Sequence, residues 1–315
     1  MTRYVLRRLG LTVITLFILS IVIFAVSVVL PGSVGRAILG QFATPESVAN
    51  LNRDLGVDGA LVPRYLKWVG GAVQGDFGDS YKFRAPVMDF LPTALFASIK
   101  LALATLVIVL PLGIIGGTFA ALRQGKASDR IITISGLTLA VTPEFVVGII
   151  LTMIFAVKLD WLPSGGSAKG SVLEQIRVLI LPALTLSAVL FGYLSRMARA
   201  GAIEALAADY TRTATLKGLP RRTVLRRHVL RNSLLPTIAV TASQMSYLLG
   251  GLLVTETLFN YRGLGLLIAD AARGRDVPML MAAVFLVGAL AMLMTLIADL
   301  PTAWLNPRVR LGATQ

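Results

Sequence analysis

The side chains that could do chemistry in this chain are few, and they exclude most kinds of catalytic site. The chain has no Cys and a single His, His228. A disulfide framework, a thiolate or multi-histidine metal site and a cysteine nucleophile are therefore excluded. A GxxxxGK[ST] loop, which cradles the phosphates of ATP, is also absent from the sequence. We expect no catalytic residue, no metal site and no bound cofactor in this chain.

Two acidic residues lie in or beside long apolar stretches. Glu144 follows a Thr-Pro pair inside the stretch 131–157, and Glu256 directly follows the stretch 232–255. Proline removes a backbone donor and kinks a helix, so polar groups near it must face protein or water. Because an ionisable residue at membrane depth indicates function, Glu144 is predicted to line a transport pathway or gate, and Glu256 to belong to a gate. The alternatives are an intersubunit hydrogen bond or a place near the membrane edge for Glu144, and an interfacial carboxylate for Glu256.

The longest polar segment, 209–232, predicts two short helices. Asp209 is a good N-cap for the first, and Gly218 can end it in the left-handed conformation, with Pro220 following. The second, about 221–231, carries five arginines. Helices shorter than about 12 residues are not stable alone in water, so these two must pack against something. The candidates are a partner protein and anionic lipid headgroups.

The composition places these residues in an all-α integral membrane protein. Of the 315 residues 56% are hydrophobic and only 15% are charged, and the mean hydropathy is +0.78. A soluble domain has about a quarter of its residues charged, so lipid must solvate much of this chain. A span needs about 20 apolar residues. Uncharged stretches of that order, with one broken only by Glu144, predict about six transmembrane helices. They are 9–30, 101–122, 131–157, 178–195, 232–255 and 277–298. The first is too long for a signal peptide and is predicted to stay uncleaved.

The distribution of positive charge orients these helices. With the N-terminus inside, the inner segments hold 17 Lys or Arg in 68 residues and the outer segments 12 in 102, counted over 1–8, 123–130, 196–235 and 304–315 inside and over 32–95, 158–177 and 259–276 outside. Cytoplasmic loops collect Lys and Arg, so both termini are predicted to be cytoplasmic. The same rule explains the net charge of +14 better than nucleic-acid binding does.

The first outer loop, 32–95, is predicted to be helical. The segment 45–56 begins with Pro45 and Glu46 and stops at Gly56, as a short helix would. A second amphipathic segment follows, with Leu61, Tyr65, Trp68 and Val69 at helical spacing. Such a loop can cap the helical bundle, dock a partner, or do both.

The predicted organisation has three parts. The first, 1–95, is the N-terminal transmembrane helix with the periplasmic helical loop. The second, 96–303, is the transmembrane core with the cytoplasmic loop 196–235, and 304–315 form a cytoplasmic tail.

The polar segment resembles the coupling loop of permeases from binding-protein-dependent ATP-binding cassette (ABC) importers, in the dipeptide, oligopeptide and nickel branch. That loop runs roughly D-Y-x-R-T-A-x-x-K-G-L, then a basic helix, then H-x-x-R-N-x-L-x-P. The matching residues are Asp209, Tyr210, Arg212, Thr213, Ala214, Lys217, Gly218, Leu219, His228, Arg231, Asn232, Leu234 and Pro236. The resemblance covers nearly the whole chain. It is greatest to the first of the two homologous permease subunits of such importers.

The resemblance implies a type I ABC importer permease fold in the bacterial inner (cytoplasmic) membrane. Two ABC ATPase subunits would bind ATP and Mg and contact the coupling loop, so the permease itself would be no enzyme. A second homologous permease would complete the pathway, and an extracytoplasmic substrate-binding protein would deliver di- or oligopeptides. That binding protein is a second possible contact for Glu256.

Other functions stay open at this point. Relatives of such permeases import nickel chelates, glutathione or oligosaccharides. A self-sufficient secondary transporter, with Glu144 and Glu256 as a proton relay, is the alternative from another class. The long coupling-loop match and the absence of an evident inverted repeat in the sequence argue against it. No catalytic constellation favours a membrane-bound enzyme.

Overall fold

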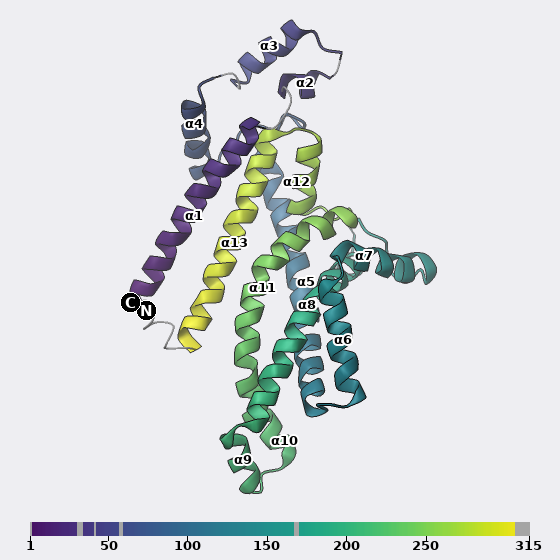
Figure 1. Ribbon diagram of the computed structural model, residues 1–315. Helices are drawn as coiled ribbons and strands as arrows, with labels where there is room; N and C mark the ends of the chain where they lie inside the picture. Colours follow the sequence, from purple (N-terminus) through teal and green to yellow (C-terminus); the bar gives the residue numbers. More distant parts are fainter. Residues whose placement is uncertain (1, 30–33, 41, 57–58, 167–169, 306–315) are drawn as a thin grey trace. The chain divides into compact units, whose positions relative to one another are not determined.

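The computed structural model describes residues 2–29, 34–40, 42–56, 59–166 and 170–305, and within them the regular structure is helical (Figure 1). The predicted tail falls outside this description from residue 306 onward. The chain divides into two compact units. The core unit contains Ile99–Tyr261 and the chain from Met294 onward, and the N-terminal unit contains Thr2–Ser98 and Arg262–Leu293. The predicted all-helical membrane fold is confirmed.

Among the residues that the structure describes, four helices are long and apolar enough to cross a membrane. They are α1 (Thr2–Val29), α5 (Leu91–Leu122), α8 (Val172–Ala207) and α13 (Val277–Leu305). Within the most apolar part of α8, 67% of the residues are buried, against 17 to 22% in the other three. The other three therefore present apolar surface to lipid, while α8 is covered by protein.

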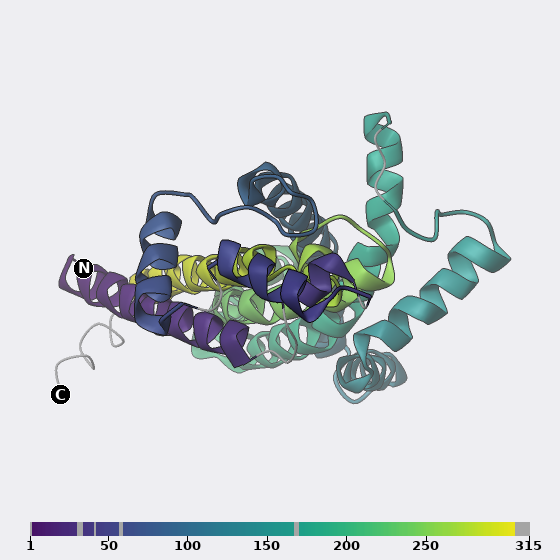
Figure 2. The ribbon, with the colours of Figure 1, turned by 90° about the horizontal axis from the view of Figure 1, so that it is seen from above.

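The predicted third span is broken rather than kinked. α6 (Ala127–Val141) and α7 (Glu144–Thr152), which continues as a π-helical turn (Met153–Lys158), meet at an angle of 108°. Thr142 and Pro143 both take extended ψ values, 130° and 134°. The physical reason is local, because a proline disfavours helical backbone at the residue before it. Figure 2 shows α7 running sideways from α6.

Around α8 the core unit is held together by close backbone contacts. A Cβ on Gly117 of α5 would lie 2.3 Å from the carbonyl oxygen of Ser195, and one on Gly192 would lie 2.1 Å from that of Gly136 in α6. Only glycine permits these approaches, as at other membrane helix interfaces. α8 itself begins with a capping box in which Ser171 and Glu174 bind each other's backbone N–H.

The remaining predicted span lies in α11 (Arg231–Leu258), which packs against α8. Its segment Tyr247–Leu258 is apolar but shorter than a full span. The prediction of a sixth span here stays a prediction, as does the orientation with both termini in the cytoplasm.

The N-terminal unit contains the two predicted helices of the outer loop. α2 (Val34–Leu39) precedes α3 (Pro45–Asp54), whose first turn is capped by the Thr44 hydroxyl, and Gly56 ends it with a φ of +66°. α4 (Leu61–Val73) then packs on the membrane helices of this unit. The Tyr65 hydroxyl lies 2.9 Å from that of Ser20, and the Trp68 ring meets the Phe285 ring edge-on at 6.0 Å.

A buried carboxylate ties the end of the outer loop to α13. Asp276 is fully buried and accepts hydrogen bonds from the Ser80 hydroxyl and from the N–H groups of Tyr81 (3.1 Å) and Lys82 (3.3 Å). α12 (Leu264–Arg273) and a 3₁₀ turn (Val87–Asp89) complete the core of this unit.

Candidate functional site

The segment between α8 and α11, residues 209–232, is called the coupling segment below. Its first helix, α9 (Asp209–Leu216), is bounded by the extended backbone of Ala208 and by Gly218, which has a φ of +73°. The predicted left-handed stop at Gly218 is thus confirmed. The predicted N-cap was wrong by one residue, since Ala208 occupies the cap and Asp209 is the first helical residue. A hydrogen bond from the Thr211 hydroxyl to the Ala205 carbonyl (2.6 Å) closes the corner in place of a side-chain cap.

The second predicted helix is not separate. α10 (Arg221–Val224) runs through a π-helical turn (Leu225–Leu230) directly into α11, with helical backbone angles at each junction. The sequence contains no Gly or Pro between residues 221 and 235 that would stop it. Any displacement of this basic stretch is therefore passed along one continuous helix into the core unit.

Four residues of the coupling segment anchor it, with relative exposures of 6% or less: Thr211, Ala214, Val224 and Val229. The opposite side faces solvent. It presents three large apolar or aromatic side chains, Tyr210 (41% exposed), Leu219 (38%) and Leu216 (79%). A short buried face and an exposed apolar tip are typical of an element that docks into a partner.

The predicted coupling residues divide between these two faces. Ala214 is buried and His228 is half-buried, with its carbonyl accepting a hydrogen bond from the Asn232 amide (2.9 Å). The others are exposed: Asp209, Tyr210, Arg212, Thr213, Lys217, Gly218, Leu219, Arg231 and Asn232. Leu216 was not among the coupling residues predicted from the sequence. Its place on α9, about 140° around the helix from Thr211 at 100° per residue, would have indicated an apolar residue off the buried face.

Glu144 lies at the start of α7 and reaches toward α11. A Cβ on Gly251 would lie 2.6 Å from its Oε2 atom and 3.0 Å from a side-chain carbon of Leu186. The Glu144 carboxylate is thus packed against the bare backbone of Gly251, beside α8. Tyr247, one turn earlier on α11, is 53% exposed.

Glu256 has a different environment. Its side chain is fully buried, and its carbonyl accepts a hydrogen bond from the Tyr261 N–H (2.8 Å), where α11 ends. Nearby, the Gly166 N–H donates to the Phe259 carbonyl (2.8 Å), so the loop before α8 covers this end. Burial of this kind does not fit a direct contact with a binding protein in this conformation.

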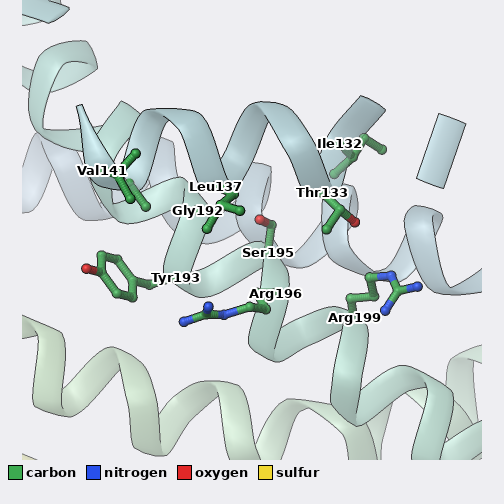
Figure 3. A pocket seen from close by; sticks show the side chains of 10 residues that line it. Ile132, Thr133, Leu137, Val141, Gly192, Tyr193, Ser195, Arg196 and Arg199 are labelled. Carbon is green, nitrogen blue, oxygen red and sulfur yellow. The ribbon is translucent and has the colours of Figure 1, made fainter. Parts of the chain in front are cut away.

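A cavity of about 260 Å³ opens between α6 and α8 (Figure 3). Its lining is Ile132, Thr133, Leu137, Ala140 and Val141 from α6, and Gly192, Tyr193, Ser195, Arg196 and Arg199 from α8. The guanidinium carbon of Arg196 lies 5.9 Å from the centre of the Tyr193 ring. No site was predicted at Arg196 or Arg199 from the sequence, where they counted only as positive charges near the cytoplasm. Their spacing of three residues, with Tyr193, would have placed all three on one helical face.

Arg199 closes one end of this cavity through an ion pair. Its Nε lies 2.6 Å from Asp129 Oδ1 and a terminal nitrogen lies 2.9 Å from Oδ2, while the Gly125 N–H also donates to Oδ2 (2.9 Å). The side chains of Arg199 and Asp129 are only 28% and 6% exposed. This two-pronged pair fixes the beginning of α6 to α8 and neutralises the charge of Arg199.

Comparison with known proteins places this architecture among transport components. A family model described as "Binding-protein-dependent transport system inner membrane component" matches residues 113–311, and the model of its N-terminal region matches residues 1–113. The probable peptide ABC transporter permease protein y4tP of Sinorhizobium fredii is 34% identical over 310 residues, 98% of this chain and 99% of that protein. The glutathione transport system permease protein GsiC of Escherichia coli is 34% identical over 313 residues, with the same two shares.

Proposed function

Because the chain belongs to the family of binding-protein-dependent transport system inner membrane components, we propose that it is the permease subunit of an importer whose cargo is di- or oligopeptides. It is an ABC importer permease of the inner membrane, a kind of subunit that does not itself hydrolyse ATP. The observation that carries the peptide assignment is the full-length similarity to a protein named as a probable peptide permease. Glutathione, itself a tripeptide, is the second candidate because the relative named for it is equally identical, at 34%.

The proposed assembly contains a second homologous permease, two ABC ATPase subunits and an extracytoplasmic substrate-binding protein. The coupling segment supplies the ATPase contact. Its exposed tip, Leu216 with Tyr210 and Leu219, enters a groove on the ATPase, and its basic stretch surrounds that contact. The buried anchors hold α9 against the permease so that it moves as one body with α10.

The proposed mechanism follows from the continuity of α10 and α11. Closure of the ATPases on ATP displaces α9, and Gly218 holds the corner between α9 and α10 in the left-handed conformation, with a φ of +73°. The displacement passes along α11 to Gly251, where Glu144 is packed. We assign Glu144 to the pathway lining and the buried Glu256 to the gate at the end of α11.

The test is reconstitution of the four proposed components in proteoliposomes. Uptake of a labelled tripeptide should require the binding protein outside, the ATPase and ATP inside, and this permease. Tripeptide uptake by the permease without an ATPase would favour the secondary transporter instead. ATP-dependent uptake of a different cargo, with no peptide uptake, would keep the assignment as an importer and overturn the assignment of peptides as its cargo.

A further inference from the structure

The cavity between α6 and α8 contains one cation that is not neutralised by a carboxylate. Arg199 is paired with Asp129, whereas Arg196 has no ion pair within the part of the chain that the structure describes. Its guanidinium lies over the Tyr193 ring. Figure 3 shows the two arginines pointing in opposite directions along α8, Arg196 toward Tyr193 and Arg199 away from it.

The rest of the lining suits a small molecule with one anionic end. Thr133 and Ser195 add hydroxyl groups, and Ile132, Leu137 and Val141 supply apolar surface. A volume of about 260 Å³ admits only part of a drug-sized ligand, since whole ligand pockets have about 300–1,000 Å³. A guanidinium beside an aromatic ring is a strong receptor for a carboxylate, because its fork donates two parallel hydrogen bonds.

A carboxylate, that of Glu144, lies beside an earlier part of α8. The Arg196 guanidinium lies beside the Tyr193 ring, and Tyr193 and Leu186, seven residues apart, lie on one face of α8. The Glu144 carboxylate lies at the level of Leu186, because a Cβ on Gly251 would be 2.6 Å from Glu144 Oε2 and 3.0 Å from a side-chain carbon of Leu186. The ten residues from Leu186 to Arg196 rise about 15 Å along the helix, and the Arg196 side chain reaches back toward Tyr193 and shortens that span (Figure 3). An extended peptide covers about 3.3–3.6 Å per residue, so the interval fits a peptide of roughly two to four residues.

We propose that Arg196 with Tyr193 binds the C-terminal carboxylate of the translocated peptide, and that Glu144 binds its N-terminal ammonium group. The inference rests on the proposed function, because it names the groups of the cargo that the import pathway recognises. The site selects zwitterionic short peptides by their two termini and leaves their side chains free. It is therefore compatible with many sequences.

A binding experiment tests the carboxylate subsite without transport. The assembled importer, in nanodiscs of zwitterionic phospholipid, is treated with phenylglyoxal, which modifies free guanidinium groups, and modification is read by peptide mass spectrometry. Trialanine should protect Arg196, and trialanine amide should not. Arg130, which is exposed on α6 outside the cavity lining, serves as the reference and should react equally in both.

Two results of this experiment would overturn the subsite. The first is that trialanine and trialanine amide protect Arg196 equally, or that neither of them protects it. The second is an Arg196 that is unreactive without cargo, or one that becomes protected only when anionic phospholipid is added, which would assign the guanidinium to a partner surface or to a lipid phosphate.

A transport experiment separates the subsite from the peptide function. Wild-type importer should prefer trialanine over its amide, and Arg196→Met should reduce that preference by roughly tenfold, the value of a charge-assisted pair. Arg130→Met should leave the preference unchanged, and Arg196→Lys should retain part of it. Glu144→Gln should remove the preference for trialanine over N-acetyl-trialanine in the same way. Normal peptide uptake by the variants, with the same preferences as the wild type, would overturn the subsite alone. If the wild type takes up none of these peptides, the peptide assignment is overturned, and the binding experiment then decides the subsite.

Discussion

The coupling segment and the cavity beside Tyr193 belong to the same unit but present their polar groups in opposite ways. In the coupling segment the anchors Thr211 and Val229 point inward, and the charged and apolar tip faces solvent. In the cavity the aromatic and cationic side chains line a space between α6 and α8 (Figure 3). The first arrangement suits contact with a protein surface and the second suits a small molecule. The structural difference is that the first depends on local backbone stops and the second on the packing of helices distant in sequence.

The largest effect on uptake is expected where the coupling segment depends on a single backbone conformation. Gly218 has a φ of +73°, and a Cβ there would meet nothing within 4 Å, so only backbone strain acts on a substitution. Gly218→Val should cost about 1–2 kcal/mol in this conformation, enough to change the population of the competent geometry by roughly 5- to 30-fold. Peptide uptake should fall by that factor while the ATPase still turns over, measured together in proteoliposomes.

The matched control for Gly218 is an asparagine. Gly218→Asn adds a side chain but tolerates the left-handed region, so uptake should stay near the wild-type rate. An equal loss of uptake in both variants would show that the side chain, and not the backbone conformation, disturbs the segment.

The next effect concerns the exposed tip. Leu216 is 79% exposed in this chain, so Leu216→Asp should leave α9 folded. If the ATPase covers this side chain, losing its burial removes about 1.5–3 kcal/mol of binding, and the affinity for the ATPase should fall by roughly ten- to a hundredfold. Titration of purified ATPase onto permease in nanodiscs measures this, with Leu216→Met as the control. Unchanged affinity for Leu216→Asp would place the ATPase contact elsewhere.

The two regions also differ in how far the sequence predicts them. Gly218 and Pro220 signal a helix stop within a few residues, so the end of α9 could be predicted, as could the two helices α3 and α4 of the outer loop. The start of α9 was misplaced by one residue because aspartate is a residue type favoured at N-caps. In the structure, the hydrogen bond from the Thr211 hydroxyl to the Ala205 carbonyl closes the corner where α9 begins. The cavity could not be predicted, because it depends on which faces of α6 and α8 meet and on the 108° bend at Pro143. A sequence shows that proline bends a helix but not by how much.

A smaller effect tests what holds the cavity wall. Asp129 and Arg199 join α6 to α8, and Arg199 is 28% exposed, so solvent weakens their attraction. A double-mutant cycle with Asp129→Asn and Arg199→Met should give a coupling of about 1 kcal/mol in thermal unfolding. A coupling that falls further in high salt fits partial exposure. Additive single effects would mean that the cavity wall does not depend on this pair.

The smallest expected effect links the two regions, at the point where α11 meets Glu144. A Cβ on Gly251 would lie 2.6 Å from Glu144 Oε2, whereas one on the adjacent Gly250 would meet nothing within 4 Å. Alanine favours a helix interior over glycine by about 1 kcal/mol in either place, so Gly250→Ala controls for the gain in helix stability. Gly251→Ala alone should force the Glu144 side chain off its rotamer at a cost of about 0.5–1.5 kcal/mol, and uptake should fall a few-fold. In a Glu144→Ala background the same Gly251→Ala change should have no further effect on uptake, because the carboxylate it displaces is gone. A persistent loss of uptake in that background would contradict displacement of Glu144 and assign the effect to Leu186, whose side-chain carbon would lie 3.0 Å from the added methyl group.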